Sequence, residues 1–91
     1  MNTLRYQRHP DLRLTALEGE GVVLHLKERR YFSVNESGLV LLEALREPRS
    51  LEDLVGSLLA EYEVTRQAAE ATTRAFLAQC LEAAVVTEQP G

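Results

Sequence analysis

Hydrophobic and polar residues alternate along the first third of the chain, as they do in strands that bury one face. Leu12-Arg13-Leu14-Thr15-Ala16-Leu17 has this period of two, and the glycine-containing break Glu18-Gly19-Glu20-Gly21 follows it. The pattern continues in Val22–Leu26 and in Arg30–Val34, on either side of the polar turn 27–29. The alternation therefore predicts a three-stranded antiparallel meander.

At residue 35 the pattern changes from that of a strand to that of a helix. Asn35 is a candidate N-cap, because its side-chain oxygen can accept a backbone N–H that a helix start leaves unpaired. Glu36 then lies at the favourable, positive end of the helix dipole. Apolar residues surround most of the segment that follows, to about Arg46, and predict a buried central helix. A small sheet needs such a cover over its apolar face.

Two further helices are predicted from apolar residues at three- and four-residue spacing. Ser50 opens a capping-box sequence with Asp53 at its third position, and the helix that follows extends to about Tyr62. Thr65 is the candidate N-cap of a third helix, which ends near Ala84. The short connection between these two helices is of the kind found in a helix-turn-helix. The chain thus predicts an α+β domain that resembles a winged helix-turn-helix, with three strands followed by three helices.

The two ends of the chain carry weaker patterns. Residues 1–11 show no periodicity, and we expect an arm that is loosely ordered or leans on the sheet. Residues 85–87 are a candidate for a short last strand, and residues 88–91 are expected to form a disordered tail. The domain therefore spans residues 12–87, and a chain of 91 residues leaves no room for a second one.

The composition is that of a soluble globular protein, with 45% hydrophobic and 26% charged residues. A formal net charge of −4 argues against a surface that neutralises phosphates. Cys80 is the only cysteine, which excludes an intramolecular disulfide and favours a reducing compartment. The start has no apolar signal region, and no apolar run approaches the ~20 residues that span a bilayer. We therefore expect a cytoplasmic protein without membrane contact.

No arrangement of residues indicates catalysis or metal binding. Cys80 lies on the apolar face of the third predicted helix, where a cysteine behaves as a small hydrophobic residue. His9 and His25 lack metal-ligand spacing with each other or with Cys80. Gly19-Glu20-Gly21 has neither the third glycine nor the following helix of a dinucleotide-binding fingerprint. We predict that the chain is not an enzyme and holds no metal or cofactor.

One candidate binding feature is the third predicted strand, Arg30–Val34. If this strand closes the meander at an edge, its unpaired backbone groups can accept a peptide as an added strand. The alternative is that the arm or another chain covers that edge. The sequence pattern leaves both arrangements open.

The other candidate feature is a set of basic side chains on the hairpin and on the third helix. In a DNA-binding protein the hairpin would be the wing and the helix would enter the major groove. Glu70 and Glu82 dilute the helix face, and the net charge has the wrong sign. We therefore rank solvated surface first, contacts to an acidic peptide second and DNA last. The basic residues are Lys27, Arg29, Arg30, Arg66 and Arg74.

Three segments of the chain resemble a known family. Tyr31-Phe32-Ser33-Val34-Asn35-Glu36-Ser37-Gly38 precedes a leucine-rich helix, and Arg49-Ser50-Leu51-Glu52-Asp53-Leu54-Val55 and Glu61-Tyr62-Glu63-Val64 follow it. Together they resemble the PqqD-like proteins, the precursor peptide recognition elements of ribosomal natural-product (RiPP) biosynthesis. The resemblance covers residues 12–86. The helix-turn-helix alone is not specific to the family. The motif in the first segment is fairly specific: an aromatic residue, any residue, an aliphatic residue, Asn-Glu, any residue and Gly.

This resemblance implies three strands and three helices that bind the leader segment of a precursor peptide. In the family, the leader adds as an antiparallel strand to the third strand and packs apolar side chains against the third helix. Main-chain bonds then provide affinity that tolerates different sequences, and side-chain pockets provide selection. The implied peptide-binding residues are Arg30, Tyr31, Phe32, Ser33 and Val34 on the strand, with Ala69, Thr73, Phe76, Leu77 and Cys80 on the helix, some of which must belong to the core.

The chain departs from the family pattern at two helix positions. Thr72 stands where relatives often carry an acidic residue, and Ala84 where they often carry a glycine. The short turn at 27–29 and the missing Pro/Arg-rich start favour a relative that serves another peptide product over a member of the quinone-cofactor pathway. A stand-alone domain of this length resembles the leader-binding B1 proteins of lasso peptide clusters.

The expected function is thus that of a non-catalytic adaptor. It would present the leader of a precursor peptide to a modifying enzyme or leader peptidase, as a monomer or weak dimer and without nucleic acid. A winged-helix transcriptional regulator that binds DNA is the alternative function. A structural domain whose sheet edge serves dimerisation is a third.

Overall fold

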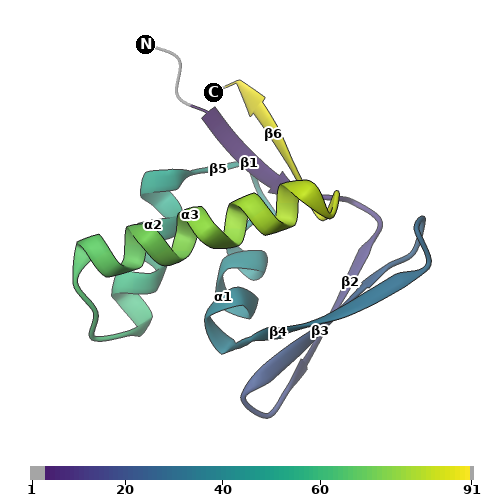
Figure 1. Ribbon diagram of the computed structural model, residues 1–91, viewed down its shortest axis with the longest axis horizontal. Coiled ribbons are helices and arrows are strands. Elements are labelled where there is room, and N and C mark those ends of the chain that lie inside the picture. The colour runs from purple at the N-terminus through teal and green to yellow at the C-terminus, as the bar shows by residue number, and fades with distance from the viewer. Residues whose placement is uncertain (1–3, 91) are drawn as a thin grey trace.

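Six strands and three helices make up residues 4–90, the part of the chain that this computed structural model describes. The predicted α+β class and the order of three meander strands before three helices are confirmed. Figure 1 shows α3 lying across α1 and α2. The elements are β1 (Leu4–Arg8), β2 (Leu12–Leu17), β3 (Glu20–His25), β4 (Arg30–Asn35), α1 (Glu36–Ala44), β5 (Arg49–Ser50), α2 (Leu51–Glu61), α3 (Arg66–Glu82) and β6 (Val86–Pro90).

The meander is an antiparallel sheet of β2, β3 and β4 with β3 in the centre. Leu17 pairs with Glu20, so β3 begins two residues before its predicted start. Gly19 takes a positive φ of 76° in the two-residue turn, which glycine adopts without strain. Gly21 has a different role, because a Cβ there would lie 2.8 Å from the Leu39 Cδ1 atom of α1. This glycine lets the central strand and the first helix approach each other.

A second antiparallel sheet, in the order β5-β1-β6, was not predicted from the sequence. β1 pairs with β6 from Leu4↔Pro90 to Arg8↔Val86. The prediction of a disordered tail is therefore wrong for residues 88–90, and the predicted arm contributes the central strand of this sheet. The parts of both predictions that concern residues 1–3 and 91 lie outside the described residues. Figure 1 shows β1 and β6 side by side, and Leu4 pairs with Pro90 where the described part of the chain begins and ends.

The core is centred on α1, as predicted, although this helix ends at Ala44, two residues before its predicted end. Leu41, Leu42 and Leu45 have no exposed surface. Asn35 is the N-cap, and its side-chain oxygen accepts the Gly38 N–H at 2.8 Å. The helices and both sheets close around these leucines. The remaining buried apolar residues are Leu12, Val23, Leu54, Val55, Leu58, Ala69, Leu77, Cys80, Val85 and Val86.

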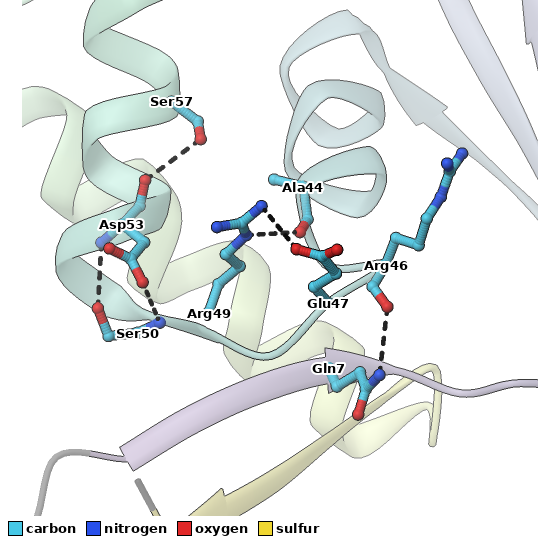
Figure 2. Close-up of polar contacts among 8 residues, drawn as sticks. All are labelled: Gln7, Ala44, Arg46, Glu47, Arg49, Ser50, Asp53 and Ser57. Carbon is cyan, nitrogen blue, oxygen red and sulfur yellow. Dashed lines mark hydrogen bonds and ion pairs between the residues drawn. The ribbon is translucent and has the colours of Figure 1, made fainter.

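The start of α2 is fixed by the predicted capping box, which Figure 2 shows. The Ser50 hydroxyl accepts the Asp53 N–H at 3.2 Å, and the Asp53 carboxylate accepts the Ser50 N–H at 3.0 Å. This backbone hydrogen bond is the main reason that the pKa of Asp53 is lowered from its ordinary value. The Arg49 guanidinium donates to the Ala44 carbonyl at 3.1 Å, and the Gln7 amide donates to the Arg46 carbonyl at 3.2 Å. The connection between α1 and α2 is therefore held from both helices and from β1.

We expect Asp53→Ala to lower the free energy of unfolding at pH 7 by about 1 kcal/mol, because it removes half of the capping box. The folded pKa of Asp53 lies below its unfolded value of about 3.9, so the contribution is present above that pH and is lost as pH falls through the folded pKa. Urea unfolding at a series of pH values measures this, and the difference between variant and parent should shrink in acid. A difference that stays constant down to about pH 2 would contradict the assigned role.

Candidate functional site

The outer edge of β4 is open, because β4 pairs with β3 on one side and with no strand of residues 4–90 on the other. The direction of its backbone groups follows from β3. The Leu26 N–H donates to the Asp11 carbonyl at 3.0 Å. Counting back from Leu26, every second residue of β3 therefore directs its backbone N–H and carbonyl to β2, and the residues between them direct theirs to β4. In β4, the residues between those that bond to β3 direct their backbone groups to the open edge. These groups are the N–H groups of Tyr31, Ser33 and Asn35 and the carbonyls of Tyr31 and Ser33.

A groove runs beside this edge, between β4 and α3. One cavity of about 170 Å³ has Phe32, Ser33 and Val34 of β4 on one side and residues of α3 on the other. A neighbouring cavity of about 290 Å³ continues the hollow past the start of α1. Phe76 and Gln79 of α3 line both cavities. An added strand on β4 would therefore lie over a largely apolar surface.

The structure separates the helix residues that were expected to form the groove wall. Thr73 and Leu77 are 0% and 4% exposed, belong to the core and line neither cavity. Ala69 is also buried, while Cys80 is buried but lines the smaller cavity. Phe76 is half-buried and lines the groove. Of the five α3 residues that were expected to form the groove wall, Phe76 is thus the one with a large, partly exposed side chain in the groove.

The sequence reasoning identified only Phe76 of a second stripe along α3. Thr72, Phe76 and Gln79 of α3 and its C-cap residue Ala83 line the cavities. The three helical positions each precede a buried residue by one, which is about one quarter turn around the helix. Three of these four are polar or small, so an apolar pattern does not reveal them. The spacing of three and four residues on either side of Phe76 was the available signal.

Gly38 explains how Phe76 reaches the groove. A Cβ at Gly38 would lie 2.9 Å from the Phe76 Cε1 atom and 3.2 Å from the Val34 Cβ atom. The Asn35 side chain that caps α1 lies on the same side, 3.2 Å from that Cβ position. The step from Val34 to Gly38 therefore brings the end of β4, the start of α1 and the aromatic ring of α3 into contact.

The far end of the groove is fixed by the last turn of α3. His25 is buried, its Nδ1 accepts the Glu28 N–H at 3.3 Å, and its Nε2 lies 3.2 Å from the Ala84 carbonyl. Because Nδ1 accepts, the proton is on Nε2, which donates to that carbonyl. The Arg30 guanidinium donates to the Ala83 carbonyl at 3.1 Å. Two residues of the hairpin thus hold the end of α3 beside β4, and Ala84 itself takes a positive φ of 60°, where a glycine is favoured.

The arginines of α3 lie in ion pairs with carboxylates. Arg66 pairs with Glu52 of α2, and Arg74 pairs with Glu70 at 3.0 Å within the helix. Both pairs are exposed, and they offset the positive charge that a DNA-binding helix would present. The arrangement agrees with the preferred interpretation of these residues as solvated surface.

Comparison with protein families decides the classification. Residues 20–86, which include β3, β4 and all three helices, match the model of the coenzyme PQQ synthesis protein D (PqqD) family. The chain belongs to the PqqD family. No curated protein gives a match.

Two solved structures resemble this PqqD-family domain. TbiB1 in complex with the TbiA(beta) leader peptide is 26% identical, with a TM-score of 0.76, over 88% of this chain and 93% of that chain. Lasso peptide synthetase B1 complexed with the leader peptide is 22% identical, with a TM-score of 0.74, over 90% of this chain and 96% of that chain. At 22% identity, the match to the second structure supports the fold alone.

Among the described residues of this PqqD-family domain, no group of three or more His, Cys, Asp or Glu side chains is placed to hold a metal ion. In the same part of the chain, none of the helices combines the length and apolar character needed to cross a membrane.

We expect the Cys80 thiol to be unreactive in the folded protein. Burial raises the pKa of Cys80 to about 12, and only the thiolate reacts with alkylating agents. Iodoacetamide at about pH 8 should therefore label the native protein at least ~100-fold more slowly than the urea-unfolded protein. Mass spectrometry of timed samples measures both rates. Equal rates would show that the helix face around Cys80 opens freely.

Proposed function

We propose that this chain is a non-catalytic adaptor that binds the leader segment of a ribosomally made precursor peptide. The leader adds to β4 as an antiparallel strand and places alternate side chains in the groove beside α3. The observation that carries the proposal is the position of the open edge: Tyr31, Ser33 and Asn35 direct unpaired backbone groups outward directly beside that groove. A strand-shaped ligand satisfies both features at once.

Membership of the PqqD family supports this function, as does the likeness to TbiB1, which was solved in complex with a leader peptide. The match to TbiB1 covers 93% of that chain, so it includes nearly the whole domain. No strand within residues 4–90 pairs with the outer edge of β4, so the backbone groups on that edge can accept an added strand.

The adaptor raises the rate of precursor modification or cleavage by positioning the precursor. By holding the leader, it raises the effective concentration of the precursor at a modifying enzyme or leader peptidase, so that the second encounter is intramolecular. The chain supplies no reacting group of its own to that step. Its buried cysteine and its ion-paired arginines agree with a binding role.

Fluorescence polarisation tests the proposal directly. Labelled leader peptides from precursor genes that neighbour the gene for this chain are titrated with protein, with a scrambled leader as control and a duplex DNA from the same region as competitor. We expect saturable binding of one leader with micromolar or tighter affinity, roughly −8 kcal/mol or better, that DNA does not compete. Binding of the DNA alone, with affinity that collapses as salt rises, would show a DNA-binding regulator instead.

A further inference from the structure

A larger hollow lies beyond the end of β4, at the start of α1 and the first half of α3. Its volume is about 440 Å³. It shares Asn35, Ser37 and Thr72 with the 290 Å³ cavity, which in turn shares Phe76 and Gln79 with the groove. The three cavities therefore follow one another along α3. The hollow, which we call the terminal pocket, is lined by Gly19, Asn35, Glu36, Ser37, Leu58, Tyr62, Val64, Ala68, Ala69 and Thr72.

The lining of the terminal pocket combines apolar side chains with one acidic side chain, Glu36. Leu58, Val64 and Ala68 are among the apolar lining residues, and Val64 is 43% exposed. The Tyr62 hydroxyl donates to the Glu36 carboxylate at 3.2 Å. The pKa of Tyr62 is raised first by desolvation and then by the charges of Glu36 and Glu61. Among the described residues, the lining includes no basic side chain.

The helix dipole gives Glu36 a structural role, because an acidic residue is favourable in the first turn of α1. That role does not account for the pocket that Glu36 lines or for the exposed Val64 beside it in the lining. A ligand with an apolar stem and a positive end would account for the pocket, for the exposed Val64 and for the carboxylate of Glu36 together. Lysine and arginine side chains have this form, since they lay their methylene groups along apolar surface and carry the charge at the end.

We propose that the terminal pocket binds a lysine or arginine side chain of the leader, at a position N-terminal to the segment that pairs with β4. This rests on the proposed function. A strand antiparallel to β4 has its N-terminal end beside Asn35, where the strand ends and the terminal pocket begins. The paired segment then gives affinity, while the charge at Glu36 helps to select which leader is bound.

The first part of the test changes the protein. With the labelled leader of the neighbouring precursor gene as probe, Glu36→Gln should weaken binding by roughly three- to tenfold and Glu36→Lys by more. Glu52→Gln is the matched control, since Glu52 is an acidic residue in the first turn of α2 outside the pocket lining. Ala68→Phe fills the terminal pocket and should weaken binding more than about tenfold. Ala71→Phe, on the same helix and outside the lining, should change it less than about twofold.

The second part changes the leader. Each lysine or arginine that precedes the paired segment is replaced by methionine, which keeps an unbranched apolar stem without the charge. For one position, this change and Glu36→Gln should each weaken binding, and the two together should weaken it little further. A leader without such a residue, or fully additive losses at every position, would overturn the inference.

The outcomes also separate this inference from the proposed function. If Ser33→Pro abolishes leader binding while all changes at the terminal pocket leave the affinity unchanged, the strand site stands and the pocket assignment is wrong. If no leader binds, both fail. Thermal unfolding of each variant keeps a loss of fold from being counted as a loss of binding.

Discussion

Ser33→Pro is expected to abolish leader binding and to leave the domain folded. The Ser33 N–H points to the open edge of β4 and makes no bond to β3, so proline removes a hydrogen-bond donor that only an added strand would use. The proline ring also occupies the space in which a partner carbonyl would approach. We expect affinity to fall at least ~30-fold in the polarisation experiment, with little change in the unfolding temperature.

Two neighbouring changes control this result. Ser33→Ala keeps the backbone N–H and should bind the leader almost as well as the parent chain. Phe32→Pro removes an N–H that bonds to β3, so it should lower the unfolding temperature as well as the affinity. Unchanged leader binding by folded Ser33→Pro would mean that the leader does not use this edge.

Phe76→Asp is expected to remove the apolar side of the groove. The ring lines two adjoining cavities, and an aspartate there places a carboxylate where apolar leader side chains would be buried. We expect affinity to fall by ~30-fold or more, which corresponds to about 2 kcal/mol. Because Phe76 packs partly against the core, the free energy of unfolding should also fall by about 1–2 kcal/mol.

Ala78→Asp is the matched control, because it adds the same charge at an exposed position of α3 that lines none of the cavities described. It should leave binding within about twofold of the parent. Phe76→Leu keeps an apolar side chain and should retain much of the affinity. A folded Ser33→Pro/Phe76→Asp double variant that still binds the leader would show that the groove has been assigned to the wrong face.

The sequence was sufficient where local chemistry decides the structure. Asn35 and Ser50 are N-caps because their own side chains reach the N–H groups three residues ahead, and the spacing alone reveals this. The leucines of α1 predicted the centre of the core because they surround the helix. The strand with the open edge, β4, was predicted from its alternating residues, with its end in error by one position.

Other features depend on partners far apart in the chain. β1 and β6 pair residues that lie 78 to 86 positions apart, and neither strand has a regular alternation of its own. Strands that depend on such a distant partner carry little local signal. Most of the residues of α3 that line the groove could not be predicted for a different reason. The spacing of apolar residues indicates which side chains are buried in the core, and it does not indicate which side chains line a surface groove. Gln79 and Ala83 line the groove of the proposed peptide site, so only the structure distinguishes them from ordinary surface.

The pairing of Leu4 with Pro90 has a consequence for how this domain can be built into larger proteins. The first and last strands, β1 and β6, lie side by side, away from β4 (Figure 1). A polypeptide attached at either end, or a host loop that receives the whole domain, can therefore meet it without crossing the proposed peptide-binding edge. The same geometry makes circular permutation feasible, with a short linker joining the present ends and new termini opened in the exposed turn 27–29. A modifying enzyme carrying the domain in this way would have its substrate tethered within one molecule.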